Sequence, residues 1–208
     1  LSSSSAASDV YKRQMLNKII LASKSKVRKN ILDKNNIPNI VKPSNIDEDV
    51  VKESLIKKKS TPEMISKNLA EIKANKISLN ELDQLVLGAD SVIDLEGELI
   101  SKPESREEAF NILKKLNGKT HCLISSVCIS KNGIMIWNNT DKAFLTMKKF
   151  SDDDLINYLS KINDEALYAY NVYQIEGEGR NLFSKIEGNE NTIMGLPVEK
   201  IKEYLIKT

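Results

Sequence analysis

Residues 18–32 read KIILASKSKVRKNIL, an apolar run joined by a serine-rich turn to a segment with helical spacing. The run at residues 18–22 predicts a short buried strand. Ser23 and Ser25 follow at once and can cap a helix, in which apolar side chains recur at helical intervals, as Val27, Ile31 and Leu32. A strand, a serine turn and a helix in this order present free backbone N–H groups to an anion, so the stretch predicts an anion-binding turn.

Helices are expected at several places further along the chain. Thr61 begins one, with a proline in its first turn and Ile72 among its apolar residues. Ser105 and Glu108 have the spacing of a capping box at the start of a helix that ends at Leu116. Two more helices are expected, one after Ser151 and one from Pro197.

Strand-like segments alternate with these helices. Residues 85–87 form one that runs directly into Gly88-Ala89-Asp90-Ser91, and residues 120–130 and 134–147 form two long ones around Asn132-Gly133, a strong hairpin signal. The alternation of strands and helices, with one long hairpin, predicts an α/β fold with a mixed sheet. Without an internal repeat or a linker, residues 15–208 are expected to form a single domain with two lobes.

The first 14 residues, LSSSSAASDVYKRQ, differ in composition from the rest of the chain. They are rich in serine and alanine and have no apolar core segment, so they do not resemble a secretory signal. We interpret residues 1–14 as a non-native or disordered leader. A short targeting peptide is the alternative interpretation.

Composition excludes several classes of function. The net charge of +2 comes from 31 basic and 29 acidic residues mixed along the chain, so nucleic acid is not an expected partner. No apolar run approaches the roughly 20 residues of a membrane helix, so a membrane is not expected either. Cys122 and Cys128 are too far apart along one strand to pair, and with a single histidine they do not suggest zinc. Free thiols in a reducing cytoplasm are expected.

Three short motifs carry candidate chemistry. Arg28 follows the serine turn and offers a planar bidentate donor for phosphate, although an ordinary capped surface helix would have the same sequence. Asp90 comes immediately after a buried strand, at the edge where α/β sheets place ligands, and could hold a metal or act as a base. An aspartate that caps the next turn is the alternative. Lys102 precedes a proline, which keeps it off any helix and lets it point into a cleft or into solvent.

The sequence pattern allows more than one role for two acidic segments. Asp47-Glu48-Asp49 could supply a further metal carboxylate or could be a solvated loop. Glu176 lies among the glycines Gly177 and Gly179, which indicate tight backbone, and the pattern does not say whether its side chain points inward or outward.

These motifs, in this order, resemble the Maf family of nucleotide pyrophosphatases. The likeness covers about residues 16–206, and several motifs in register make it specific. The motifs are LASKSKVRKNIL at 21–32, Asp47-Glu48, AEIKA at 70–74, GADS at 88–91, Lys102-Pro103, Gly118 to His121, IEGEG at 175–179, IEG at 186–188 and GLP at 195–197.

The resemblance implies a fold, a reaction and a site. The fold is a central twisted mixed β-sheet with flanking helices, split into two lobes around a cleft as in inosine triphosphate pyrophosphatases. The reaction is metal-dependent hydrolysis of nucleoside triphosphates, canonical or modified, to monophosphate and pyrophosphate by a cytoplasmic enzyme and possible homodimer. The implied cofactor is a divalent cation, Mg or Mn, held by Asp90 and Glu48, which are also the catalytic carboxylates. The implied substrate-binding residues are Ser23, Arg28, Lys73, Lys102, Ser91 and Glu176.

Departures from the family pattern bear on specificity and activity. Lys26-Val27 replaces the proline and first arginine of the opening motif, and Ser91 replaces a threonine. Glu176 stands where the pyrimidine-preferring branch has glutamine, and a glutamate accepts two hydrogen bonds from a guanine edge, which favours a purine. The branch that prefers methylated guanosine triphosphate shares this glutamate, but its tryptophan near position 27 and glutamine near position 91 are absent here.

The missing arginine leaves a second hypothesis open. The chain could be a non-catalytic nucleotide-binding regulator of cell division or septum formation. Asp90, Lys73, Lys102 and Arg28 argue for the enzyme, because a protein that only binds nucleotide does not need a carboxylate beside the phosphates.

Overall fold

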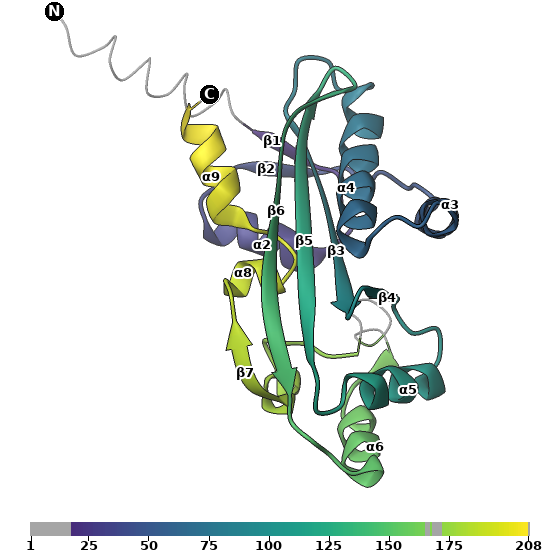
Figure 1. Cartoon of the computed structure of the whole chain (residues 1–208). Coiled ribbons are helices and arrows are strands. Elements are labelled where there is room, and N and C mark those ends of the chain that lie inside the picture. Colours follow the sequence, from purple (N-terminus) through teal and green to yellow (C-terminus); the bar gives the residue numbers. More distant parts are fainter. Residues whose placement is uncertain (1–17, 165–166, 168–171, 208) are drawn as a thin grey trace, which may run out of the picture.

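The computed structural model describes residues 18–164, 167 and 172–207 (Figure 1). The predicted leader, residues 1–14, lies outside the described residues, so its interpretation stays a prediction. None of the described helices is long and apolar enough to cross a membrane.

The sheet is mixed, as predicted. Its strands run in the order β2-β1-β3-β5-β6-β7, with β4 paired to β3. β1 is parallel to β2 and β3, and every other pair is antiparallel. The strands are β1 (Ile19–Leu21), β2 (Asn39–Val41), β3 (Val86–Leu95), β4 (Glu98–Ile100), β5 (Thr120–Lys131), β6 (Ile134–Met147) and β7 (Phe183–Glu187).

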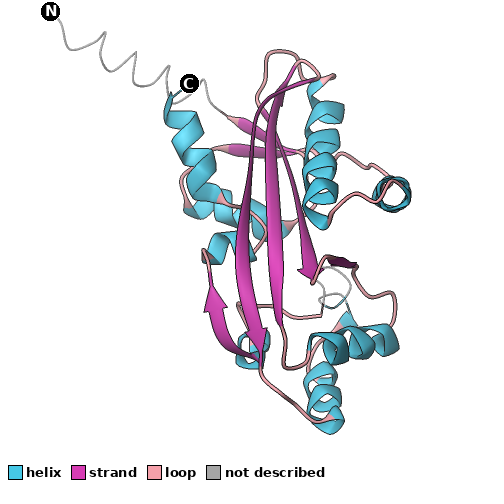
Figure 2. Cartoon of the chain, viewed as in Figure 1, coloured by secondary structure: helices cyan, strands magenta, loops and turns pink. Residues whose placement is uncertain are grey.

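The long hairpin of β5 and β6 forms where Asn-Gly predicted it. Asn132 and Gly133 adopt φ values of 52° and 82°, the left-handed pair that a two-residue hairpin turn requires. The hairpin runs along most of the length of the molecule, beside β3 (Figures 1 and 2).

Helices lie on both faces of the sheet (Figure 1). The predicted N-caps Ser25, Thr61, Ser105 and Ser151 each accept a hydrogen bond from the third helical N–H. The helices are α2 (Lys26–Lys34), α3 (Glu48–Lys57), α4 (Pro62–Ser78), α5 (Arg106–Leu116), α6 (Asp152–Ser160), α8 (Glu190–Ile193) and α9 (Val198–Lys207), with a 3₁₀ turn at Glu178–Leu182.

Two local predictions were wrong in detail. The carboxylate of Glu108 accepts from the N–H of Glu104 rather than Ser105, so the reciprocal capping box is not made there. Ile72 is exposed, because the buried stripe of α4 runs through Ile65, Leu69 and the small residues beside them. The helix α3, the strand β7 and the short helix α8 were not predicted.

The core is divided between two lobes. One apolar cluster packs α5 and α6 against the ends of β3, β5 and β6 that include Ile93, Leu123 and Leu145. Two further clusters pack the other ends of these strands and β1, one against α2 and α9 and one against α4. The same long strands pass through both lobes, so both lobes are built on one continuous sheet. That residues 15–208 form a single domain stays a prediction.

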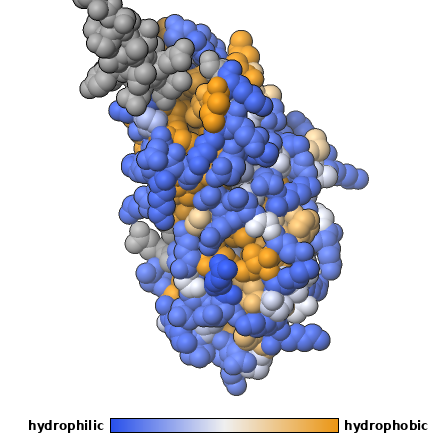
Figure 3. Space-filling view, turned by 90° about the vertical axis from the view of Figure 1, so that its left-hand side faces the viewer, coloured by the Kyte–Doolittle hydropathy of each residue, from blue (hydrophilic) through white to orange (hydrophobic). Residues whose placement is uncertain are grey.

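The surface carries apolar side chains among hydrophilic ones. The face shown in Figure 3 is mostly hydrophilic, with two apolar areas. Exposed large apolar residues of the chain include Ile134, Ile136 and Phe144 of β6. The homodimer that the resemblance suggests stays a prediction.

Candidate active site

A break in the sheet creates the site. β1 ends at Leu21, opposite Leu87, and β4 first meets β3 at Ile93. Within the described part of the chain, the residues of β3 between these points pair only with β5. The other edge of β3 is open there, and a pocket of about 520 Å³ lies beside it.

This geometry corrects the predicted position of Asp90. The sequence suggested that the strand ends before Asp90, whereas Asp90 lies in the middle of β3, which continues to Leu95. The edge that exposes Asp90 is produced by the end of the neighbouring strand, which no local pattern around Asp90 indicates.

The pocket brings together every residue that the sequence nominated. The open edge lets side chains from both faces of the sheet reach the same space, because successive residues of a strand point to opposite faces. Asp90 points to the α4 face and Ser91 to the α2 face, as their hydrogen-bond partners show. The nominated residues that line the pocket are Ser23, Arg28, Glu48, Lys73, Asp90, Ser91, Lys102 and Glu176.

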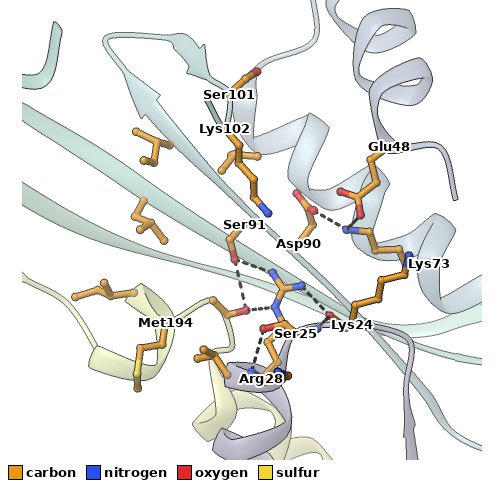
Figure 4. A pocket seen from close by; sticks show the side chains of 18 of the residues that line it. Lys24, Ser25, Arg28, Glu48, Lys73, Asp90, Ser91, Ser101, Lys102 and Met194 are labelled. Carbon is orange, nitrogen blue, oxygen red and sulfur yellow. Dashed lines mark hydrogen bonds and ion pairs between the residues drawn. The ribbon is translucent and has the colours of Figure 1, made fainter. Parts of the chain in front are cut away.

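Lys73 of α4 joins two carboxylates at the centre of the site. Its Nζ lies 2.8 Å from Oδ1 of Asp90 and 3.0 Å from Oε1 of Glu48 (Figure 4). Lys73 and Asp90 are both buried, so their pairing offsets the cost of removing two charges from water. The lysine therefore pairs with both carboxylates and holds them close together.

Oδ2 of Asp90 is a buried carboxylate oxygen without a hydrogen-bond partner among the described residues. Such an atom is costly unless something occupies its lone pairs. The described residues contain no group of three or more potential metal ligands. Mg²⁺ commonly binds through one or two carboxylates together with substrate phosphates, so Asp90 and Glu48 fit a cation that arrives with its substrate.

Gly88 allows α4 to approach β3 closely enough for this pairing. A Cβ atom at position 88 would lie 2.0 Å from the carbonyl oxygen of Ala70 and 2.8 Å from the nitrogen of Ala74. The Ser66 hydroxyl donates to the main-chain oxygen of Asp90 at 3.1 Å, which fixes the same contact one turn earlier in α4. Lys73 therefore reaches Asp90 because the glycine brings the helix close to the strand.

The charges around the pocket act on one another. Burial raises the pKa of Glu48, but the attraction and hydrogen bond of Lys73, with help from Lys52 and Lys102, leave that pKa below its usual value. Burial, followed by repulsion from Arg28, lowers the pKa of Lys102. The Lys102 ammonium points into the space beside Asp90 and Ser91 (Figure 4).

Arg28 is held largely by the protein itself. Its Nε donates to the oxygen of Gly195 at 2.9 Å, and Nη1 donates to the oxygen of Ala89 at 2.8 Å and to Ser23 at 3.3 Å. Nη2 donates to Ser91 at 3.2 Å. A guanidinium has five N–H groups, so one of them remains to meet a phosphate. Arg28 thus ties α2 to β3 and to the loop before α9, and its phosphate-binding role stays a prediction.

The two nominated serines differ in what their hydroxyls can donate. Oγ of Ser23 accepts from the N–H of Ser25 and from Arg28, so its own proton is left for a ligand. Ser125 donates to the carbonyl oxygen of Thr192, and the hydrogen bond between Ser91 and Ser125, 2.8 Å long, must therefore be donated by Ser91. Ser91 consequently orients Arg28 and has no proton to offer a phosphate.

The sequence model of the Maf family, described as "Maf-like protein", matches residues 18–208. The chain belongs to the Maf family.

Individual relatives agree with this placement. The chain is 72% identical over 191 residues to the "Nucleoside triphosphate pyrophosphatase" of Pelagibacter ubique, covering 92% of this chain and 98% of that protein. It is 39% identical to the "7-methyl-GTP pyrophosphatase" of Bartonella quintana, covering 88% and 92%. The HAM1 protein of Coxiella burnetii, solved as a structure, superposes with a TM-score of 0.51 at 11% identity, over 92% of this chain and 100% of that one. That likeness concerns the fold alone, and it supports the predicted α/β architecture.

Residues that the Maf motifs did not nominate also line the pocket. Lys52 of α3 is one of them, and the sequence did not point to it because α3 itself was not predicted. Its spacing of four residues from Glu48 would have indicated that the two side chains share a helix face. Apolar side chains cover another part of the wall: Ile93, Leu99, Ile100, Leu123, Tyr173, Ile193 and Met194.

His121, the histidine of a Maf motif, supports this wall from behind. It is buried, and its Nε2 lies 2.6 Å from the hydroxyl of Tyr173, which lines the pocket. The rings of His121 and Tyr173 also pack against Phe183. Burial lowers the pKa of His121 to about 4, so the imidazole is neutral at physiological pH.

This neutral histidine makes stability depend on pH. The unfolded chain binds the proton with the ordinary pKa of about 6.5, more tightly than the folded protein does, so acid favours unfolding between pH 6.5 and 4. We expect His121 to account for a loss of about 2 kcal/mol in unfolding free energy between pH 7.5 and pH 5. Urea unfolding of the wild type and of His121→Gln at the two pH values measures this loss, because the other titratable groups contribute equally in the two proteins. Parallel pH dependences would show that the pKa of His121 is the same in the folded and the unfolded protein.

Proposed function

We propose that this chain hydrolyses nucleoside triphosphates to nucleoside monophosphate and pyrophosphate, with a divalent cation such as Mg or Mn. The observation that carries the proposal is the buried Asp90 carboxylate, whose Oδ2 has no partner among the described residues and lies in a pocket lined by cationic side chains. The names of the Maf relatives from Pelagibacter ubique and Bartonella quintana support the same reaction class.

The pocket has two chemically different parts that suit a nucleotide. One part contains the Ser23 hydroxyl and the start of α2, where the first-turn N–H groups of Lys26 and Val27 have no intrahelical acceptor. The other part is the apolar wall with Tyr173 and Met194, which suits a nucleobase. The phosphates would bind at the first part and the base at the second, which places the α-phosphorus near Asp90.

The carboxylates would then act on the attacking water. Asp90 is oriented by Lys73 through Oδ1, which leaves Oδ2 to hold a metal ion or to accept a proton from water. Water attacks the α-phosphorus, the bond from this phosphorus to the bridging oxygen breaks, and pyrophosphate leaves. A divalent cation, held by Asp90 and Glu48, would supply neutralisation of the phosphate charge. Lys102, and the N–H of Arg28 that the protein leaves unbound, would stabilise the charge on the phosphoryl oxygens.

Val27 is the departure that favours the alternative hypothesis, a non-catalytic nucleotide-binding regulator of septum formation. It lines the pocket and also packs against the core cluster around α2. The pocket thereby lacks one cation of the family motif, but the carboxylate pair and Lys73 are complete. The enzyme is therefore the better-supported function.

Pyrophosphate release from a panel of nucleoside triphosphates, canonical and modified, with Mg, Mn or Co, tests the proposal. We expect pyrophosphate and the matching monophosphate in equal amounts. Glu176 is exposed and lines the pocket, and a preference for purines would support the prediction that it binds the base edge. Tight triphosphate binding without release under any metal would support the regulator instead. The removal of non-canonical or modified nucleotides in the cytoplasm stays a prediction.

A further inference from the structure

α3 is an exposed helix with one face turned toward the pocket. None of its residues is buried, and Figure 1 shows it set apart from the sheet, beyond α4. Its less exposed residues are Glu48, Val51, Lys52 and Leu55, which share one face at helical spacing. Two of them, Glu48 and Lys52, line the pocket. Burial of apolar side chains therefore does little to explain the position of α3. The helix brings two charged side chains to the site.

Lys52 differs from Lys57, the other lysine of α3. Its side chain is 21% exposed, whereas that of Lys57 is 79% exposed. Among the described residues it pairs with Asp49 at 3.6 Å, and the Asp49 side chain is 88% exposed. An ion pair of this kind contributes little and exchanges readily with another anion. An anionic ligand in the pocket can therefore replace Asp49 as the partner of Lys52 with little loss of free energy.

Two other cations of the pocket, Lys73 and Arg28, are already bound by groups of the protein. Lys73 is divided between Asp90 and Glu48, and Arg28 donates to two main-chain oxygens and two serines. A triphosphate brings several negative charges, which several cationic groups are needed to neutralise. Lys102 and, at the start of α2, Lys24 and Lys26 also line the pocket. Lys52 adds a positive charge on the α3 side.

The charge of Lys52 affects the pKa values of two other residues of the site, Glu48 and Lys102. Together with the stronger influence of Lys73 it opposes the effect of burial on the pKa of Glu48. After burial and Arg28, it also contributes to the lowered pKa of Lys102. Lys52 and Lys102 therefore repel each other in the free protein, and a polyanion between them would relieve that repulsion.

We propose that Lys52 binds the terminal phosphates of the substrate, those that leave as pyrophosphate, and so makes α3 the element that distinguishes triphosphates from diphosphates. The inference rests on the proposed function for the identity of the substrate. Lys52 lies four residues, about 6 Å, beyond Glu48 along α3. With the α-phosphorus beside Asp90 and Glu48, the phosphates further from the base extend toward Lys52.

Binding of inorganic tripolyphosphate with Mg²⁺, measured by calorimetry, tests Lys52 independently of turnover. We compare Lys52→Met, which keeps the apolar stem, with Lys52→Arg and with the control Lys57→Met on the same helix. Loss of one charge-assisted contact is expected to weaken binding roughly tenfold or more in Lys52→Met. Lys52→Arg should retain most of the affinity and Lys57→Met all of it. Equal affinities of the two methionine variants would overturn the proposal.

Steady-state kinetics separate this role from a structural one. For a nucleoside triphosphate, Lys52→Met should raise KM by about the same factor, with kcat changed less than about threefold. For the corresponding diphosphate, any turnover should depend much less on Lys52. A fall in kcat alone, with KM unchanged, would contradict the proposal. If the wild type releases no pyrophosphate but tripolyphosphate binding still depends on Lys52, the proposed function fails and the assignment of Lys52 stands.

Discussion

Asp90→Asn is expected to lower the turnover of nucleoside triphosphates by roughly two orders of magnitude or more. The amide has the same shape, but its nitrogen cannot accept a proton or bind a metal, and its oxygen carries no full charge. Oδ2, the atom without a partner among the described residues, loses its function in this variant. Lys73 keeps its ion pair with Glu48, so the fold is expected to survive.

Measurement of kcat together with the thermal midpoint tests this prediction. Asp94→Asn is the matched control, because Asp94 lies on the same strand and does not line the pocket. Wild-type turnover in Asp90→Asn would show that the carboxylate is not catalytic. A large drop in the thermal midpoint would show instead that Asp90 acts mainly through its ion pair with Lys73.

Gly88→Ala is expected to destabilise the protein by about 3 kcal/mol or more, a large effect for one methyl group. The new Cβ would lie 2.0 Å from the carbonyl oxygen of Ala70, and this neighbour is backbone in the middle of α4, so no side chain can move aside. The helix would have to shift away from β3 as a unit. That shift would also separate Lys73 from Asp90 and reduce activity in the fraction that remains folded.

Urea unfolding of Gly88→Ala measures the loss. Gly177→Ala is the control, because a Cβ there meets nothing within 4 Å and the backbone has a negative φ. Its stability should stay close to that of the wild type. Wild-type stability in Gly88→Ala would mean that α4 approaches β3 less closely than the structure describes.

Most of the regular structure could be predicted from local signals. Ser25, Thr61 and Ser151 cap the helices that they were expected to cap, and Asn132-Gly133 forms the hairpin turn. The helix α3 was missed because its N-cap, Asp47, belongs to an acidic run that resembles a solvated loop. Its residues include no buried apolar side chain, so the periodic signal that indicates other helices is weak.

The candidate site residues were predicted by resemblance to a family, and their spacing alone would have left each one ambiguous. The structure shows that they meet in one pocket, but it also changes the interpretation of individual roles. Arg28 was expected to bind phosphate and is mainly bound to the carbonyls of Gly195 and Ala89. Ser91 donates its hydroxyl proton to Ser125. These partners could not be read from motifs, because a motif gives the residue type and not the direction of its hydrogen bonds.

Capping, turn formation and helical periodicity depend on residues a few positions apart, and for that reason the amino-acid sequence was sufficient to predict the helix starts, the hairpin and the mixed α/β class. The interactions that form the site join segments that are distant in the sequence. Lys73 and Asp90 are 17 residues apart and Arg28 and Gly195 are 167 apart. The end of β1 opens the edge of β3, and Gly88 brings α4 to it. Only the tertiary structure decides these contacts, because burial and strand pairing over the whole chain determine which side chains share the pocket.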